Sequence, residues 1–198
     1  TKADELVVVL DKCTDTSKEI SRQFTERLFE GSWDIEGQRR NFGLDACQGD
    51  WILEIDADER VPEALAVESC RVMRTSNADW HGILVDNYIG DRLVRYGWGA
   101  SFGKSQYPGL FRKGSKTWGR QRVHPSLSFS GTQGFTLKNG IDHYVDRNIS
   151  DMIRRLDSYT TARALDIRQN RDGGSYVRNL RRIFSRLRKC YVNRKGYK

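Results

Sequence analysis

The sequence lacks features that define several classes of protein. No apolar run approaches the roughly 18 residues that a membrane-spanning helix needs, which argues against a spanning helix in these residues. The four cysteines are widely spaced and form no C-x-x-C pair, which argues against a zinc knuckle, a redox motif or a dense disulfide framework and favours a reducing cytosol. No signal peptide is visible. The chain opens at TKADELVVVL without a methionine, as expected of a segment of a longer protein.

The charge is unevenly distributed along the chain. The 198 residues include 34 Lys and Arg against 26 Asp and Glu, and 37% of them are hydrophobic, which is typical of a single globular domain. Nine basic residues and no acidic ones lie between Tyr176 and Lys198, so the rest of the chain holds 25 basic against 26 acidic residues. A nucleic-acid-binding protein would interleave basic and aromatic residues across its body, so we expect no nucleic-acid partner.

The first third of the chain predicts alternating strands and helices. The apolar residues 5–10 predict a buried parallel strand, and a helix is predicted from Thr16 to Leu28 because apolar residues recur at helical spacing behind a capping-box pattern. A second unit follows, with a helix over 38–47 and a strand over 51–55. This alternation indicates an α/β sheet, in which ligands bind beyond the carboxyl ends of the strands.

The remainder of the chain continues with both element types. Pro62 predicts the first position of a helix, and residues 81–89 predict a further strand. Short strand-like pieces such as residues 109–113 follow in a stretch that is rich in glycine and aromatic residues. A helix is predicted over 148–167, with Ser150 as its cap.

Three carboxylates stand at the end of the strand over 51–55, in the motif D-A-D-E. Two aspartates separated by one residue, Asp56 and Asp58, can point to the same side of an extended segment and bind one hard divalent cation. The alternative is that they cap or solvate a turn, but they lie too far upstream of Pro62 to cap its helix. Phosphatases of the haloacid-dehalogenase type need Thr or Val at the position of Arg60.

Three segments follow one another in a characteristic order: ADELVVVLDKCTDTSKEI, GQRRNFGLDACQGDWILEIDADERV and LFRK…VHP…HY. They resemble family 2 glycosyltransferases, in particular the bacterial branch that adds sugars to the lipopolysaccharide core, up to about residue 167. The resemblance implies a GT-A-like α/β fold with a mixed, mostly parallel sheet flanked by helices. It further implies a catalytic domain over residues 1–147 without its N-terminal strand, and a helical extension over 148–198.

The resemblance implies a nucleotide-diphosphate sugar as donor and a divalent metal, Mn²⁺ or Mg²⁺, as cofactor. Asp11 matches the position that holds the nucleotide base. Asp15 matches the second Asp of an S-T-D turn, and it can equally be a helix-start residue. Arg39 matches a Q-R-N stretch in which a cation suits the diphosphate. Arg40 can exchange roles with Arg39, and either can be a solvated residue of a helix face.

The same resemblance assigns roles around the D-A-D-E motif. Asp56 matches the sugar-contacting carboxylate and Asp58 the metal ligand, and Glu59 is expected to support them. His124 matches a histidine that completes the metal or pyrophosphate site. His143 occupies another recurring position and is expected to be mainly structural, the alternative being that it is the ligand in place of His124.

The catalytic base stays unassigned. Inverting transfer needs a base for the acceptor hydroxyl, while a metal neutralises charge on the departing diphosphate. Many relatives read V-H-E where this chain has Pro125, and proline cannot accept a proton. Asp142 and Asp86 are alternatives, and each can equally be a turn or strand-end residue.

We therefore expect a metal-dependent, inverting glycosyltransferase of the cytoplasm that acts on a saccharide or glycolipid acceptor, as in lipopolysaccharide or other cell-envelope glycan synthesis. One alternative is a nucleotidyltransferase, which usually needs a glycine-rich phosphate loop after its first strand, and none is visible. The other is a non-enzymatic basic module that binds nucleic acid.

The basic tail predicts an amphipathic helix. Apolar residues fall on one face and arginines around the rest, a pattern of helices that lie in the interface of an anionic membrane at about 1 kcal/mol per basic residue. Such a helix would hold the enzyme on the inner face of the cytoplasmic membrane, near a lipid-linked acceptor. The alternative is an ordinary helix that packs its apolar face on the domain.

Overall fold

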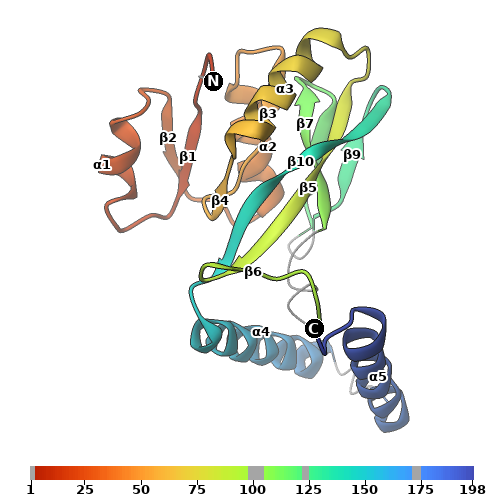
Figure 1. The fold of residues 1–198 in the computed structure, drawn as a ribbon. Helices are drawn as coiled ribbons and strands as arrows, with labels where there is room; N and C mark the ends of the chain where they lie inside the picture. The colour runs from red at the N-terminus through yellow and green to blue at the C-terminus, as the bar shows by residue number, and fades with distance from the viewer. Residues whose placement is uncertain (1–2, 98–104, 122–124, 171–174) are drawn as a thin grey trace. The chain divides into compact units, whose positions relative to one another are not determined.

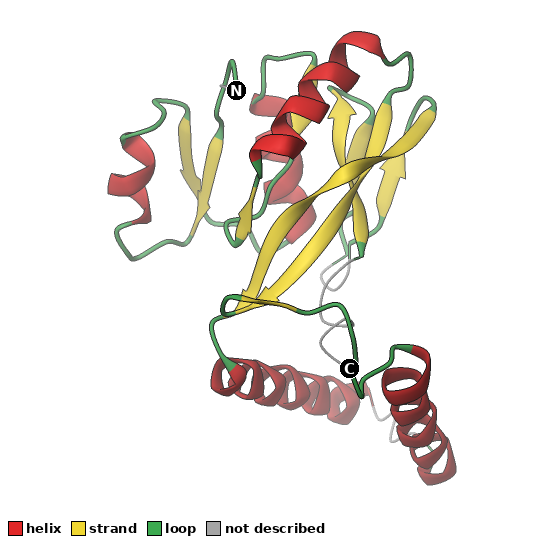
Figure 2. Ribbon diagram, viewed as in Figure 1, coloured by secondary structure: helices red, strands yellow, loops and turns green. Residues whose placement is uncertain are grey.

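The computed structural model describes residues 3–97, 105–121, 125–170 and 175–198. Helices and strands follow one another along the chain as Figures 1 and 2 show. The elements are β1 (Val8–Asp11), α1 (Ser17–Arg22), β2 (Leu28–Gly31), α2 (Glu36–Ala46), β3 (Trp51–Leu53), β4 (Glu59–Arg60), α3 (Glu63–Thr75), β5 (Trp80–Ile89), β6 (Arg92–Leu93), β7 (Gln106–Arg112), β8 (Lys116–Trp118), β9 (Leu127–Phe129), β10 (Gln133–Asp146), α4 (Ile149–Asn170), α5 (Tyr176–Arg188) and a π-helical turn, η2 (Lys189–Asn193).

The chain divides into two compact units that are interleaved in sequence. Unit 1 comprises residues 1–55, 63–83 and 107–139, and unit 2 comprises residues 56–62, 84–106 and 140–198. The turn after β3 therefore clusters with the end of β10 and with the two C-terminal helices. The division into a catalytic domain over 1–147 and an extension over 148–198 stays a prediction.

The main sheet is mixed. Its strand order is β3-β7-β5-β10-β4, with β6 paired to β5, and β1-β2 and β8-β9 form separate two-stranded sheets among the described residues. The β1–β2 pair is parallel, whereas β3–β7, β4–β10, β5–β6 and β8–β9 are antiparallel. The α/β class is confirmed, but the expectation of a mostly parallel sheet is wrong. From β5 to β10 the described elements are strands with no helix among them, and short connections favour antiparallel pairing because a parallel pair needs a long crossover.

The N-terminal helix is shorter than its apolar spacing predicts. Helix α1 ends at Arg22, and Leu28 begins strand β2, which pairs with β1 from Val8 to Asp11. The proposed cap also differs, because Asp15 Oδ1 rather than the Thr16 side chain accepts the Ser17 N–H, at 3.0 Å. Leu28 is thus used in a strand pair, where cross-strand hydrogen bonds to β1 outweigh its helical spacing.

Later elements agree more closely with their predicted ranges. Helix α2 covers residues 38–46 of the predicted 38–47, strand β5 covers 81–89, and β7 contains residues 109–112 of the predicted strand piece. Helix α3 begins one residue after Pro62. Helix α4 begins at Ile149, and its cap is Asn148 rather than Ser150, because Asn148 Oδ1 accepts the Asp151 N–H at 2.9 Å.

In unit 1, polar contacts fix the helices to strands. The Asn41 side chain of α2 hydrogen-bonds both the backbone N–H and the carbonyl of Trp118 in β8. Glu68 of α3 is buried and accepts hydrogen bonds from the backbone N–H groups of Lys138 and Asn139 and from the Asn139 side chain, at 2.7–3.0 Å. Among the described residues, the largest fully buried side chains come from α3, β5, β7 and β10: Leu65, Val72, His81, Ile83, Leu110, Phe111, Leu137 and Ile141.

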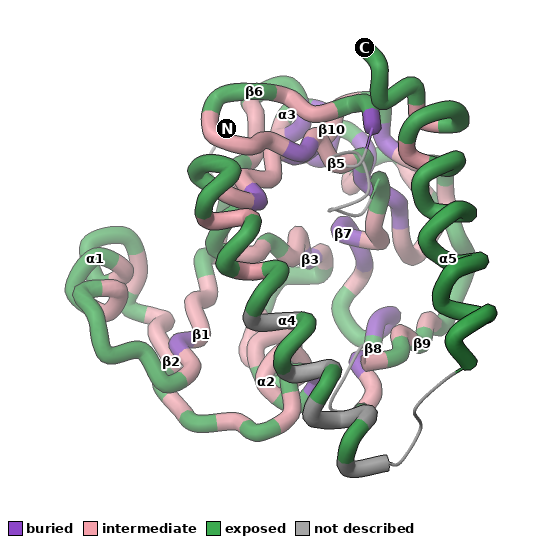
Figure 3. Tube along the Cα trace, turned by 90° about the horizontal axis from the view of Figure 1, so that it is seen from below, coloured by how far each residue is buried: buried purple, intermediate pink, exposed green. Residues whose placement is uncertain are grey.

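Unit 2 joins the ends of β5 and β10 to two helices. The Gly90 N–H donates to the Asp146 carbonyl at 2.8 Å, and Tyr88 stacks on Tyr144 with ring centroids 5.1 Å apart. Helix α4 follows β10 directly, and Arg155 pairs with Asp146 at the end of that strand. Every residue of α5 is exposed, as the green tube in Figure 3 shows. No helix in the part of the chain that the structure describes is long and apolar enough to cross a membrane.

Candidate functional site

The D-A-D-E motif forms a turn that strand pairing holds against β10. Strand β3 ends at Leu53, and after the turn β4 pairs antiparallel with β10, with His143 opposite Glu59. The Tyr144 N–H also donates to the Asp58 carbonyl at 2.8 Å. This pairing brings together two residues that are 85 positions apart in the sequence, Asp58 and His143.

Asp58, His143 and Asn87 form a connected row in unit 2. His143 Nε2 lies 3.3 Å from Asp58 Oδ2, and His143 Nδ1 lies 2.8 Å from Asn87 Oδ1. Carboxylate and amide oxygens accept hydrogen bonds, so both ring nitrogens can donate when the imidazole is protonated. Asn87 is buried, whereas the Asp58 side chain is 49% exposed. The row therefore runs from the interior of the sheet to a carboxylate that solvent and ligands can reach.

The contact between Asp58 and His143 favours the charged form of both groups. The hydrogen bond from His143 holds the pKa of Asp58 below its usual value, although partial burial opposes this. The same hydrogen bond raises the pKa of His143 against the effect of its burial, and the charges of Asp58, Glu59 and Asp56 act in the same direction. The row thus presents an ionised carboxylate at neutral pH.

Glu59 stabilises the turn itself. The Asp56 N–H donates to Glu59 Oε2 at 2.9 Å, and the Glu59 N–H donates to the Asp56 carbonyl at 3.0 Å. Burial raises the pKa of Glu59, and the nearby Asp56 and Asp58 charges add to this, while the hydrogen bond from Asp56 opposes it. These contacts agree with a supporting role for Glu59.

The donor atoms of this turn suit a hard divalent cation, which prefers carboxylate oxygens. In the described ranges, no group of three or more His, Cys, Asp or Glu side chains is arranged to hold a metal ion. His124, predicted as a ligand, lies outside the described residues. Magnesium-type sites often use one or two carboxylates and complete their coordination with substrate phosphates and water, so the exposed Asp58 carboxylate fits such a cation.

Asp11 and Arg39 meet in unit 1, at the carboxyl end of β1. Arg39 Nη1 of α2 lies 3.7 Å from Asp11 Oδ2, and the Trp33 N–H donates to Asp11 Oδ1 at 3.1 Å. Asp15 lies in the turn that follows β1, where the hydrogen bonds from Ser17 hold its pKa below the usual value. Asp15 therefore acts as a helix-start residue, one of the two interpretations of its sequence position.

Arg40 is engaged elsewhere in unit 1. Its guanidinium contacts Glu54 Oε1 at 3.0 Å and Glu36 Oε1 at 2.8 Å, and it lies over the Trp118 ring. Of the two neighbouring arginines, Arg39 is thus the one that reaches Asp11.

The Glu54 cluster is a feature that sequence reasoning missed. Lys116 Nζ lies 2.5 Å from Glu54 Oε2, and the Trp118 indole N–H donates to Glu54 Oε1 at 3.2 Å. The Lys116 side chain is 1% exposed and that of Glu54 is 12% exposed. The sequence signal for this cluster was the single glutamate in the apolar run WILEI. A charge inside a buried strand requires a partner nearby, so Glu54 predicts such a partner.

The two alternatives for the catalytic base do not share the face of His143. Successive residues of a strand point to opposite faces, so Asp142 points away from His143, and Asp86 points away from its neighbour Asn87. Burial raises the pKa of Asp142 and the Asp86 charge adds to this, while Arg60 opposes it. Both carboxylates belong to the opposite face, beside Tyr88 and Tyr144.

The known proteins that the chain resembles are described as glycosyltransferases. Residues 1–79, which include the D-A-D-E turn, match the model of the family described as Glycosyl transferase family 2. Together with the mixed sheet and its flanking helices, this match is consistent with a GT-A-like fold.

Curated relatives from Rickettsia extend the likeness along the chain. An uncharacterized glycosyltransferase of Rickettsia prowazekii (strain Madrid E) is 26% identical over 173 residues, and one of Rickettsia typhi (strain ATCC VR-144 / Wilmington) is 25% identical over 173 residues. Each alignment covers 83% of this chain and 59% of the relative, so the chain spans about three fifths of the length of these relatives. The family model and both relatives are described as glycosyltransferases.

Proposed function

We propose that this chain belongs to a glycosyltransferase that moves a sugar from a nucleotide-diphosphate donor to a saccharide or lipid-linked acceptor. The observation that carries the proposal is the Asp58–His143–Asn87 row. Its Asp58 lies on a turn inside the segment that matches family 2, and the row presents a half-exposed, ionised carboxylate.

Asp58 is the proposed metal ligand, and His143 is proposed in preference to His124 as the histidine beside it. Asn87 accepts the Nδ1–H of His143 and so directs Nε2 toward Asp58. A cation bound there would displace the Nε2 proton and leave the neutral, Nδ1-protonated ring that metal-binding imidazoles use. A bound Mn²⁺ or Mg²⁺ would supply the positive charge that stabilises the departing diphosphate. Asp56 is proposed to contact the donor sugar.

Asp11 and Arg39 are proposed to bind the nucleotide part of the donor. Asp15, in the turn that follows Asp11, is proposed to contact the donor as well. The Asp11 carboxylate can accept hydrogen bonds from a base, and the neighbouring guanidinium can pair with phosphate oxygens. Transfer is proposed to be inverting, and no base is assigned to it. Asp142 and Asp86 are disfavoured as bases because they point to the face opposite His143.

We further propose a cytoplasmic role in lipopolysaccharide or another cell-envelope glycan. This finer assignment depends on the sequence resemblance to the enzymes that build the lipopolysaccharide core.

The test is calorimetric titration of the chain with nucleoside diphosphates and nucleotide-diphosphate sugars in the presence of Mn²⁺. Binding is expected to need the metal and to weaken at least about tenfold in Asp58→Asn, because the removed charge is the proposed metal ligand. Asp50→Asn is the matched control, since Asp50 is an exposed aspartate outside the turn, and it is expected to bind as the wild type does. Binding that Asp58→Asn leaves unchanged would contradict the proposed site.

Product analysis separates the proposed activity from nucleotidyl transfer. A glycosyltransferase releases the nucleoside diphosphate from its sugar donor. A nucleotidyltransferase instead forms a nucleotide-sugar and pyrophosphate, and those products would reject the proposal.

A further inference from the structure

Helix α5 carries an exposed apolar face that the proposed transfer reaction does not use. Its apolar side chains are 39–78% exposed, and the large Phe184 side chain is 68% exposed. They are Tyr176, Val177, Leu180, Ile183, Phe184 and Leu187. Exposed apolar groups that are contiguous on one helix face, rather than scattered, mark an interaction surface.

The separation of the two faces of α5 is complete. At 100° per residue, the six apolar side chains fall within an arc of about 120°, and the five arginines and the two other polar residues occupy the rest. Arg181 and Arg188 border one side of the apolar arc, and Arg186 lies toward the other side. Long arginine side chains at such borders can keep their guanidinium groups at a polar boundary while the apolar face is buried.

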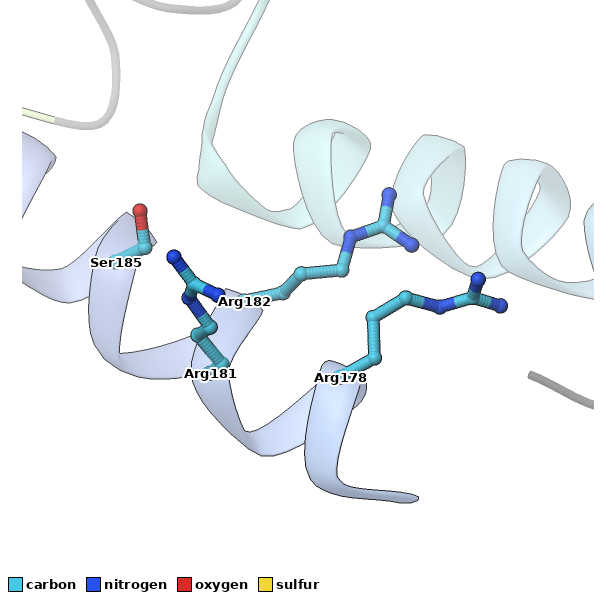
Figure 4. A pocket seen from close by; sticks show the side chains of 4 residues that line it. All are labelled: Arg178, Arg181, Arg182 and Ser185. Carbon is cyan, nitrogen blue, oxygen red and sulfur yellow. The ribbon is translucent and has the colours of Figure 1, made fainter. Parts of the chain in front are cut away.

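The polar side of α5 gathers positive charge in one place. Arg178, Arg181, Arg182 and Ser185 line an open hollow, and Figure 4 shows Arg178 and Arg182 extended in the same direction. Guanidinium groups bind phosphate oxygens with a pair of parallel hydrogen bonds, so these arginines suit phosphate headgroups. Tyr191 and Val192 of η2, which follows α5 directly, are also exposed.

Charge identifies the occupant of this surface. The segment from Tyr176 to Lys198 has nine basic residues and no acidic ones, so its partner should be anionic. A second copy of the chain would bring like charges together at the edges of the apolar face. A nucleic acid would neutralise the arginines but would leave the apolar side chains in water. An anionic bilayer satisfies both faces at once.

We propose that α5 docks on the surface of an anionic phospholipid membrane. The apolar face enters the boundary between headgroups and acyl chains, and the arginines bind lipid phosphates. The helix lies in the plane of the interface. Membrane binding by this surface needs neither the sugar donor nor the acceptor. The membrane proposal can therefore fail while the proposed transferase function stands, and the transferase function can fail while the membrane proposal stands.

The experiment is sedimentation of the whole chain with vesicles of phosphatidylcholine alone or mixed with phosphatidylglycerol. We expect binding to the mixed vesicles to be at least about tenfold tighter than to the neutral ones and to weaken as salt is added. Phe184→Asp should weaken this binding at least about tenfold, because a carboxylate would enter the apolar boundary.

Asn179→Asp is the matched control, since it adds the same side chain on the polar side of α5, at a residue that does not line the arginine hollow. It is expected to weaken binding no more than about fivefold, the effect of one added negative charge near the surface. Leu187→Asp provides a second apolar-face variant, and far-ultraviolet circular dichroism checks that each variant keeps its helix. Equal losses in Phe184→Asp and Asn179→Asp would overturn the proposal. So would equal binding to both vesicle types, or self-association or RNA binding in place of vesicle binding.

Discussion

Glu54 and Asp58 are carboxylates four residues apart after the same strand, yet their surroundings differ completely. Glu54 contacts Lys116, Arg40 and the Trp118 indole, and its side chain is 12% exposed. Asp58 contacts His143 and is 49% exposed. A carboxylate enclosed by cations and an indole has its acceptor positions used within the protein, whereas a half-exposed one has room for a ligand.

The difference separates a structural charge from a functional one. Removing one partner of a buried ion pair leaves an uncompensated charge in a poorly solvated place, so such residues are needed for folding. A half-exposed, charged aspartate contributes little to stability, so its environment is more readily explained by binding. The two positions therefore predict opposite outcomes for the same chemical change.

The largest expected effect is on stability at Glu54. Glu54→Gln should lower the free energy of unfolding by about 3 kcal/mol, because Lys116 would lose its paired charge while remaining buried. Asp58→Asn should change it by less than about 1 kcal/mol, because the pair with His143 is half-exposed and such pairs contribute little. Urea unfolding measures both. Equal losses in the two variants would break the distinction between the sites.

A second stability effect is expected at Glu68, with a defined pH dependence. Burial opposes the ionisation of Glu68, but the hydrogen bonds from Lys138 and Asn139 outweigh it and hold its pKa below the usual value. A carboxyl group whose pKa is lowered by folding stabilises the fold at pH values above its unfolded-state pKa. This stabilisation is lost as the pH falls through the folded-state pKa.

Glu68→Gln should therefore cost about 2 kcal/mol at neutral pH, the scale of hydrogen bonds to a charged group. The difference from wild type should shrink as the solution becomes acidic. Unfolding curves at several pH values measure it, and a difference that stays constant with pH would show that the charge of Glu68 plays no part.

Substitution of Asn87 tests whether its hydrogen bond orients the His143 ring toward Asp58. Asn87→Ala should weaken Mn²⁺ binding in the presence of a nucleoside diphosphate about tenfold, because His143 would lose the contact that fixes its ring. Calorimetric titration reports this change. Unchanged metal affinity, with His143 still required, would show that the ring needs no such support.

The smallest effect is expected on the other face of the strand. Asp142→Asn should alter donor affinity less than about threefold, because neighbouring strand residues point to opposite faces. It should also leave donor turnover close to the wild-type rate. Loss of turnover with unchanged donor affinity would instead identify Asp142 as the missing base.

Local signals predicted much of the fold. Strand β5 and helix α4 follow from apolar spacing, helix α2 follows from the repeated alternation of strand and helix, and the D-A-D-E turn follows from its position at a strand end. Strand β2 was missed because its first residue, Leu28, continues a helical spacing that the tertiary pairing with β1 overrides. Its partner strand lies about twenty residues away, beyond the reach of a local pattern.

Of the candidate site, only the aspartates and their proximity to one another could be predicted from the sequence. The aspartates stand in a short motif, but His143 and Asn87 are 85 and 29 positions further along the chain than Asp58, and only strand pairing brings them to it. The partner of Glu54 was hidden for the same reason, since Lys116 is 62 residues away. Sequence patterns reveal which groups are chemically unusual, whereas long-range pairing decides what they meet.

We propose that Asp58 and His143 together mark the metal end of a donor site. The most direct measurement follows the imidazole signals of the three histidines by nuclear magnetic resonance as Mn²⁺ and a nucleoside diphosphate are added. Paramagnetic Mn²⁺ broadens the signals of nearby nuclei. We expect strong broadening of the His143 signals in the wild type and none in Asp58→Asn. Broadening of His124 while His143 stays sharp, or the same response in both proteins, would contradict it.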